Sequence, residues 1–140
     1  MYKQIIIARK DLEMTPGKLS AQVSHGSLAF LTTEIVKNSK ENEINYSAEL
    51  FFSKDLFKEW IEGSFTKCVL KAKNKNHLLK AKTMAEELGL KENEDFFLIY
   101  DNCRTELIPE DNGRTLTVIG FKPMKAEFID KIGKKYQLYI

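Results

Sequence analysis

The chain has 140 residues, a formal net charge of +2 at pH 7, 43% hydrophobic residues and 30% charged residues. This length and composition predict one folded domain over residues 1–140, with a core that needs no disulfides. No apolar run reaches the roughly 18 to 20 residues of a membrane-spanning helix, so we expect no membrane partner. Cys68 and Cys103 lack metal-ligand spacing, and no signal-peptide pattern is visible. These features predict a reduced, cytoplasmic protein.

The charges are unevenly distributed along the chain. Residues 66–85 hold six lysines and no acidic residue, whereas residues 41–62 and 86–95 carry most of the compensating acids. This local basicity is compatible with a polyanion that docks on one side. A lysine-rich strand edge and helix face exposed to solvent would produce the same pattern, so charge alone leaves both interpretations open.

Hydrophobic periodicity and turn residues divide the chain into strands and helices. The run Ile5-Ile6-Ile7 is typical of a strand buried on both faces, and Thr15-Pro16 is a helix start. We expect, in chain order, a strand over 2–8, a helix over 16–37, a loop over 38–46, a short helix from Ser53 through Ile61, a strand over 66–72, a helix over 77–88 capped by Asn76, a strand over 95–100, a loop over 102–113, a strand over 114–121, a helix from Pro123 to near Gly133, and a short strand over 136–140. This order predicts a layered α/β domain with a mostly parallel sheet and one reversed strand.

A polar stripe lies on the otherwise apolar helix over 16–37. Lys18, Gln22 and His25 stand at positions i, i+4 and i+7 and therefore share one helical face, with apolar residues on both sides. An ammonium, an amide and an imidazole in this setting indicate a site. Each residue also has an ordinary interpretation, because a lone helical histidine is usually a structural residue and an exposed glutamine is usually a solvated amide.

A second polar segment follows the hydrophobic strand over 95–100. It supplies the carboxylate of Asp101 and the hydroxyl of Thr105. Ligands of open α/β sheets bind at the carboxyl ends of strands, and the first helix begins at the same edge if the two strands are parallel. We therefore expect Lys18 to lie near Asp101, either as a structural ion pair or as a cation that orients a carboxylate acting on water. Asp101 could also be a turn former.

Several known site patterns do not occur in the sequence. There is no P-loop, dinucleotide fingerprint, nucleophile elbow or zinc-ligand spacing. A covalent serine mechanism and a zinc mechanism therefore lack support, and we expect no metal and no cofactor.

The chain opens with a strand that ends in Arg9-Lys10-Asp11-Leu12, followed by Gly17-Lys18 and then Ala21-Gln22-Val23-Ser24-His25. These motifs resemble the opening of the type-two peptidyl-tRNA hydrolases, which is a strand ending in Arg-Lys-Asp-Leu, then Gly-Lys, then Ala-Gln-x-x-His. Later pieces agree in order: Trp60 and Gly63, Lys67 to Lys71, Ala85 to Leu90, Asp101 and Thr105, Ile108-Pro109, Arg114-Thr115, and Ile119 to Pro123. The resemblance covers nearly the whole chain.

The resemblance implies hydrolysis of the ester bond between peptide and tRNA, which recycles tRNA. The implied fold is a three-layer α/β/α single domain with a small mixed, mostly parallel sheet of about four strands, and the implied assembly is a homodimer. By matched position, the expected catalytic residues are Lys18, Gln22, His25, Asp101 and Thr105. The candidates for contacts to tRNA phosphates are Arg9, Lys10, Lys71, Lys73, Arg104 and Arg114.

One departure from the family pattern falls beside the expected site. The family has Asp-Ala-Gly-x-Thr where this chain has Asp101-Asn102-Cys103-Arg104-Thr105, and glycine permits a backbone conformation that cysteine resists. The alternative hypothesis is therefore a non-catalytic relative that binds tRNA or a protein and has an altered 101–105 loop. A third hypothesis is an esterase for small molecules.

Overall fold

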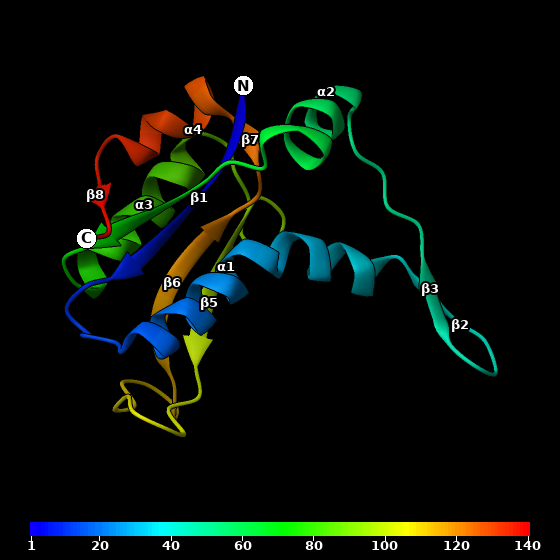
Figure 1. Cartoon of the computed structure of the whole chain (residues 1–140). Helices are drawn as coiled ribbons and strands as arrows, with labels where there is room; N and C mark the ends of the chain where they lie inside the picture. Colours follow the sequence, from blue (N-terminus) through cyan, green and yellow to red (C-terminus); the bar gives the residue numbers. More distant parts are fainter.

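A six-stranded sheet forms the centre of the computed structural model, which describes residues 1–140 (Figure 1). Its strands are β1 (Tyr2–Arg9), β4 (Lys67–Ala72), β5 (Phe96–Asp101), β6 (Thr115–Phe121), β7 (Met124–Lys125) and β8 (Gln137–Leu138). The helices are α1 (Pro16–Lys37), α2 (Lys54–Leu56) with its π-helical continuation η1 (Phe57–Ser64), α3 (Lys75–Glu87) and α4 (Ala126–Gly133). A separate hairpin consists of β2 (Ser39–Glu41) and β3 (Tyr46–Ala48).

The sheet is mixed but mostly antiparallel. Its order is β5-β6-β1-β4-β8, and β7 pairs with the beginning of β1. Only β1 and β4 are parallel neighbours, while the other four pairings are antiparallel. The predictions of a mostly parallel sheet and of about four strands are therefore wrong. The chain returns from β5 to β6 without a crossover helix, which gives an antiparallel pair, and β7 and β8 are too short to show a period in the sequence.

The strand directions decide which ends of the chain segments meet. Strand β6 lies between β1 and β5 and runs antiparallel to both, so β1 and β5 point in the same direction. Their carboxyl ends consequently lie at one edge of the sheet. The helix that follows β1 begins at the edge where β5 ends in Asp101.

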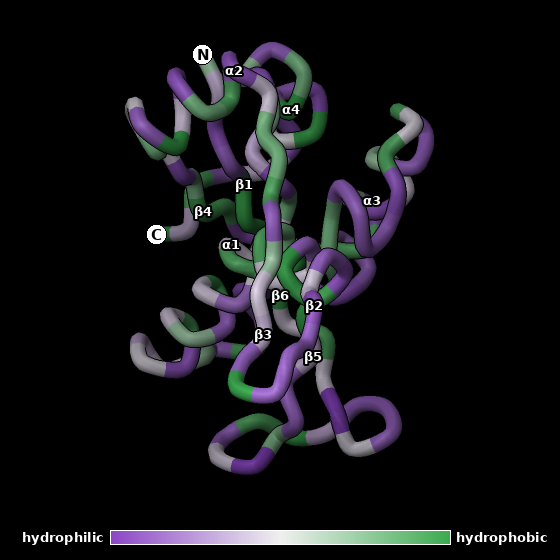
Figure 2. Tube along the Cα trace, turned by 90° about the vertical axis from the view of Figure 1, so that its right-hand side faces the viewer, coloured by the Kyte–Doolittle hydropathy of each residue, from purple (hydrophilic) through white to green (hydrophobic).

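Helices cover both faces of the sheet. Alternate residues of β1 point to opposite faces. Ile5 and Ile7 join the larger core under α3 and α4, whereas Ile6 and Ala8 pack with Val118 under α1. Figure 2 shows that hydrophobic residues concentrate around β1, β6 and the adjoining part of α1. No helix of the chain combines the length and the hydrophobicity that a membrane crossing requires.

Helix α1 rests on the sheet through an unusually close backbone contact. Gln22 and Gly26 are its only fully buried residues. Gly26 faces Gly120 of β6, and a Cβ atom built on Gly120 would lie 2.0 Å from the Gly26 carbonyl oxygen. Gln4 of β1 also connects α1 to β6 by hydrogen bonds, because its side-chain amide donates to the carbonyl oxygens of Ser27 and Phe121 at 2.8 and 2.9 Å.

Three local expectations are corrected by the structure. The segment over 38–46 contains strand β2 and the turn to β3, whose turn is closed by the Asn42 side chain. Helix α3 is capped by Asn74, whose side-chain oxygen accepts from the His77 N–H, and not by Asn76. Helix α4 begins at Ala126 and not at Pro123, because the residues before it pair with β1 as β7.

The contact between α1 and β6 predicts the effect of adding one methyl group. Gly120→Ala should lower the free energy of unfolding by about 3 kcal/mol, because its Cβ has no space against the Gly26 backbone. Gly17→Ala is the matched control, since nothing lies within 4 Å of its Cβ position, and it should change stability by less than about 1 kcal/mol. Urea unfolding of both variants measures this difference, and equal stabilities would contradict the described packing.

Candidate active site

Lys18 and Asp101 form an ion pair at the shared edge of β1 and β5. The Lys18 Nζ lies 2.7 Å from Asp101 Oδ1, and the two side chains are 14% and 9% exposed. Lys18 belongs to the first turn of α1, which Thr15 caps by accepting from the Lys18 N–H. The structure therefore brings together two residues that are 83 positions apart in the sequence, as the strand-end argument predicts.

Two further groups hold the Asp101 carboxylate, one from α1 and one from the loop that follows β5. Its Oδ1 also accepts from Gln22 Nε2 at 3.3 Å, and its Oδ2 accepts from the Cys103 backbone N–H at 2.9 Å. Gln22 is itself oriented by the Thr117 hydroxyl, which donates to Gln22 Oε1 at 2.6 Å. Because Gln22 and Thr117 are buried, the amide has a defined orientation toward the carboxylate.

The pair keeps free hydrogen-bonding capacity. The ionised Asp101 carboxylate has about four acceptor positions and uses three of them, so one position on Oδ2 is free. The Lys18 ammonium has about three donors and uses two, toward Asp101 and toward Thr105 Oγ1 at 3.1 Å. An unused acceptor on Asp101 and an unused donor on Lys18 thus lie within one partly buried cluster. The acceptor can hold a water molecule, and the donor can hold the oxygen atom of a bound carbonyl group.

The loop over 102–114 that follows Asp101 is fastened to α1 at its near end. Glu106 accepts from the Thr15 hydroxyl at 2.7 Å and from the Thr15 backbone N–H at 3.0 Å. These hydrogen bonds hold the pKa of Glu106 below its ordinary value. The same threonine therefore caps α1 and holds the loop, which keeps Thr105 within reach of Lys18.

Arg9 fastens the far end of the same loop. Its guanidinium is 4% exposed and uses all of its N–H donors on Asp11, Glu110 and the Leu116 carbonyl oxygen. Burial lowers the pKa of Arg9, but the hydrogen bonds that Arg9 donates to the carboxylates of Asp11 and Glu110 more than offset this effect, so its pKa is raised. Arg9 was expected to contact nucleic acid, yet it has no donor left for a phosphate. No sequence motif identifies Glu110 as a partner of Arg9.

Cys103 occupies the position at which glycine was expected. Its φ of 57° is in the left-handed region, which a residue with a Cβ enters at a cost of roughly 1 to 2 kcal/mol. In this conformation its N–H points to Asp101, and its Sγ lies 3.3 Å from the Thr115 hydroxyl oxygen. The cysteine therefore adopts the backbone conformation that glycine would favour, and the departure in sequence leaves the Asp101 carboxylate held in place.

The remaining expected residues lie outside the cluster. His25 is exposed on α1, and its side chain makes no hydrogen bond. Arg104 is exposed in the loop, and the Arg114 guanidinium lies 4.6 Å from the Tyr100 ring centroid. Lys10 and Lys73 are exposed and Lys71 is half-buried, and all three line a hollow beside the first turn of α1.

Sequence reasoning missed several supporting groups. Thr117, Glu106 and Glu110 orient the cluster without belonging to either recognised motif. A usable signal existed only for Thr117, because a hydroxyl residue within a fully buried strand requires a hydrogen-bond partner. No group of three or more His, Cys, Asp or Glu side chains has a geometry that could hold a metal ion.

Comparisons with known proteins give one consistent family. The family model described as Peptidyl-tRNA hydrolase PTH2 matches residues 2–139. The peptidyl-tRNA hydrolase of Methanopyrus kandleri is 38% identical over 133 residues, which cover 94% of this chain and 93% of the relative. That of Thermoplasma acidophilum is 33% identical over 139 residues, 99% of each chain. The bovine "Peptidyl-tRNA hydrolase 2, mitochondrial" (Bos taurus) is 33% identical over 138 residues, 99% of this chain and 64% of the relative.

The Arg9–Glu110 pair predicts a defined loss of stability in acid. The Arg9 hydrogen bonds lower the pKa of Glu110 below its ordinary value of 4.5, so this pair stabilises the fold above that pH and loses its effect as the pH falls below it. Glu110→Gln should cost about 1 to 2 kcal/mol at pH 7, and the difference from the wild type should shrink below pH 4.5. Urea unfolding from pH 7 to pH 3 measures this change.

Glu62 provides the control for this measurement. Its ion pair with Lys58 is 3.2 Å long and exposed, so Glu62→Gln should have little effect at any pH. If Glu110→Gln and Glu62→Gln have the same pH profile, the Arg9 cluster does not fasten the loop.

Proposed function

The chain belongs to the peptidyl-tRNA hydrolase PTH2 family, and we propose that the Lys18–Asp101 pair is where it hydrolyses the ester between peptide and tRNA. The observation that carries this assignment is the combination of one free acceptor on Asp101 with one free donor on Lys18. Ester hydrolysis needs both, because a water must be oriented and deprotonated while negative charge develops on the carbonyl oxygen.

Asp101 is proposed to act on the water. A water donating to the free position on Oδ2 would be oriented with its oxygen toward the ester carbonyl carbon. As the new C–O bond forms, the water proton passes to Asp101. The bond from carbon to the 3′ oxygen of the tRNA then breaks, and this oxygen takes the proton from Asp101, so the carboxylate is restored without a covalent intermediate.

Lys18 is proposed to stabilise the negative charge of the transition state. Its third N–H is free to donate to the carbonyl oxygen while the other two hold Asp101 and Thr105. Gln22 has a second amide N–H that can hold the water or the carbonyl oxygen. We assign His25, which lies farther along the same helix and is exposed, to a contact with the 3′-terminal nucleotide.

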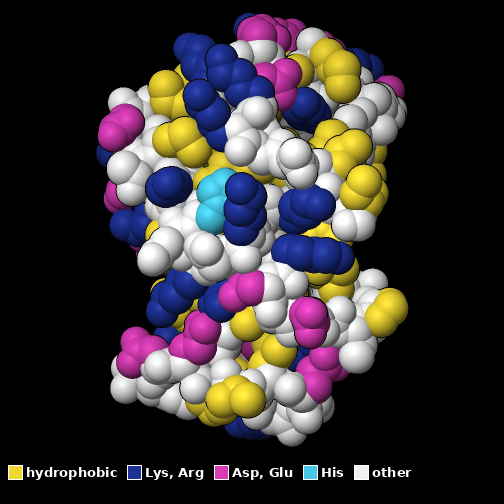
Figure 3. Space-filling view, turned by 90° about the vertical axis from the view of Figure 1, so that its left-hand side faces the viewer, with side chains coloured by type: hydrophobic (Ala, Val, Ile, Leu, Met, Phe, Trp, Pro, Cys, Tyr) yellow, Lys and Arg dark blue, Asp and Glu magenta, His cyan; other side chains and the backbone are white.

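The tRNA backbone is proposed to lie on the basic side of the molecule. Lysine and arginine side chains gather on the face that carries β8 and the beginning of α3 (Figure 3). From the expected set, Lys10, Lys71 and Lys73 lie on this side of the first turn of α1, and Arg104 and Arg114 belong to the loop after Asp101. Arg9 is left out because its donors are already used.

We further propose a homodimer formed through the far end of α1. Large hydrophobic side chains are exposed there and on the neighbouring segments, among them Leu28, Val36, Phe51 and Phe65. Leu28 and Phe65 line an apolar hollow of about 270 Å³, together with Trp60. An exposed apolar surface of this kind favours association of two copies.

The expectations of a single domain and of a cytoplasmic location remain predictions.

No observation favours the non-catalytic alternative. That hypothesis depended on a loop altered by Cys103, but the cysteine takes the left-handed conformation and its N–H still contacts Asp101. Release of peptide from peptidyl-tRNA by the purified protein tests the activity directly. Hydrolysis of simple esters that tRNA does not inhibit would instead support the small-molecule esterase.

Removing either charge of the pair should abolish most of the activity. Asp101→Asn and Lys18→Ala should each lower kcat for peptidyl-tRNA at least about a hundredfold, because one loses the proton acceptor and the other loses the oxyanion donor. Initial rates of peptide release measure this effect. Lys91→Gln, which removes an exposed lysine outside the site, is the control and should match the wild type. A folded Asp101→Asn variant with an unchanged rate would remove Asp101 from the mechanism.

The basic residues should contribute to the affinity for tRNA, because each contact between a basic side chain and a phosphate releases a counterion. Lys73→Gln and Arg104→Gln should each weaken tRNA binding and reduce the slope of log K against log salt concentration by roughly 0.7 to 0.9. Binding titrations between low and moderate salt measure this slope. The kcat of both variants at saturating substrate should equal that of the wild type, and an unchanged slope would exclude the substituted residue from the phosphate contacts.

A further inference from the structure

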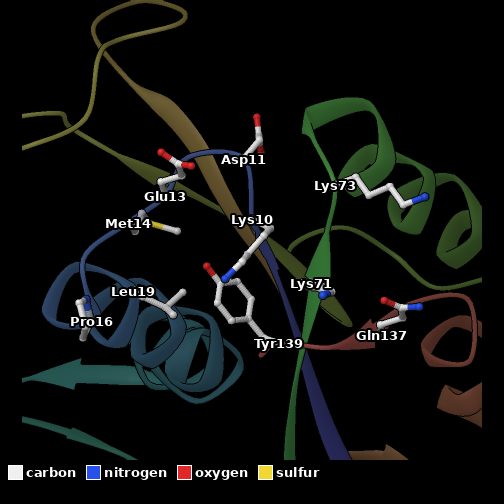
Figure 4. A pocket seen from close by; sticks show the side chains of 10 residues that line it. All are labelled: Lys10, Asp11, Glu13, Met14, Pro16, Leu19, Lys71, Lys73, Gln137 and Tyr139. Carbon is white, nitrogen blue, oxygen red and sulfur yellow. The ribbon is translucent and has the colours of Figure 1, made fainter.

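A hollow of about 890 Å³ lies beside the first turn of α1 (Figure 4). Its walls come from the segment after β1, the start of α1, the end of β4 and the last residues of the chain. The volume lies within the range of about 300 to 1,000 Å³ that is typical of ligand pockets. None of the proposed steps of ester hydrolysis uses this hollow.

Tyr139 provides a fixed aromatic surface in the hollow. Its backbone N–H donates to the Val69 carbonyl oxygen at 2.9 Å, and its side chain packs against the cluster of Ile6, Ala8 and Val118. Partial burial raises the pKa of Tyr139, so the phenol stays uncharged near neutral pH. A ring held in this way can stack against a flat ligand without losing conformational entropy of its own.

The charges around the ring favour an anion. Lys10 places its Nζ 4.6 Å from the Tyr139 ring centroid, and Lys71 and Lys73 line the side of the hollow toward β4. The acidic residues Asp11 and Glu13 lie at the opposite rim, with their carboxylates directed away from the ring (Figure 4). Asp11 moreover forms an ion pair with Arg9 at 2.8 Å. The ammonium groups nearest the ring are therefore those of Lys10 and Lys71, whereas the Lys73 side chain points away from the ring (Figure 4).

The hollow adjoins the proposed catalytic pair. Leu19 and Pro16 line it, and Lys18 stands between them in the sequence on the same turn of α1. A tRNA whose 3′ end reaches Lys18 and Asp101 would thus have its preceding nucleotides beside the first turn of α1. Aromatic stacking combined with ammonium contacts to phosphate is the usual way in which proteins bind unpaired nucleotides.

We propose that the hollow binds an unpaired nucleotide next to the 3′-terminal one, with its base stacked on Tyr139 and its phosphate held by Lys10 and Lys71. This inference rests on the proposed function, because it assigns a second subsite for the same substrate. Lys10 leaves the ring face for the phosphate when the base stacks. The 3′ strand then bends over the start of α1, and the ester reaches the catalytic pair from the basic side.

The test compares Tyr139→Leu, Tyr139→Phe and the control Tyr46→Leu on two substrates. One substrate is peptidyl-tRNA, and the other is the same peptidyl ester on a single terminal nucleoside. Tyr139→Leu should raise KM for peptidyl-tRNA about tenfold with kcat unchanged, and it should not change the rate on the minimal ester. Tyr139→Phe keeps the ring, and Tyr46 is an exposed residue of the distant hairpin, so both variants should match the wild type.

A spectroscopic measurement makes the test independent of turnover. An uncleavable amide analogue carries the fluorescent base 2-aminopurine next to its 3′-terminal nucleotide, and stacking on Tyr139 should quench its emission. The quenching should persist with Tyr139→Phe and disappear with Tyr139→Leu. If Tyr139→Leu does not fold, Tyr139→Met serves in its place, and the same results are expected for it.

Two outcomes overturn the inference while the proposed function stands. One is an unchanged KM and unchanged quenching in the folded Tyr139→Leu variant, or in the Tyr139→Met variant that replaces it. The other is an equal loss on both substrates, which would mean that Tyr139 only supports the fold. A wild-type protein that releases no peptide from peptidyl-tRNA would overturn the proposed function itself, and this subsite would fall with it.

Discussion

The proposed active site depends on the close seat of α1 on β6. Gly26 and Gly120 bring the two backbones together, and four residues earlier in α1 the Gln22 amide is buried between Thr117 and Asp101. Four residues before that, Lys18 reaches Asp101 at 2.7 Å. Lys18, Gln22 and Gly26 lie on one face of α1. The backbone contact between Gly26 and Gly120 therefore also sets the distance of Lys18 and Gln22 from the sheet. An added methyl group would therefore move the ammonium as well as the helix.

The second constraint is the set of carboxylates that hold the loop after Asp101 in place. The loop after Asp101 is fastened by carboxylates that pair with groups near β1 and α1, namely Glu110 with Arg9 and Glu106 with Thr15. These ties leave Lys18 and Asp101 as the pair with free hydrogen-bonding positions. They also separate two kinds of basic residue, since Arg9 acts inside the protein whereas Lys10, next to it in the sequence, faces the hollow beside Tyr139.

Much of the architecture could be predicted from local patterns. The buried run of β1, the Thr15-Pro16 start of α1 and the strand before Asp101 lie where periodicity and capping residues indicated. The direction of the strands could not be predicted this way. Hydrogen bonding between distant strands decides it, and β7 and β8, at two residues each, leave no period to detect. Thr117 and Glu110 were missed because their role exists only through partners about a hundred positions away.

The sequence by itself determined the family and the pair of residues at the centre of the proposal, because helical spacing and a strand end are local properties that neighbouring residues encode. Only the tertiary structure decided that Arg9 is buried, that Cys103 adopts a left-handed conformation with its N–H on Asp101, and that Tyr139 stands among lysines. Burial and backbone conformation depend on what the rest of the chain places around a residue. No pattern within a short segment carries that information.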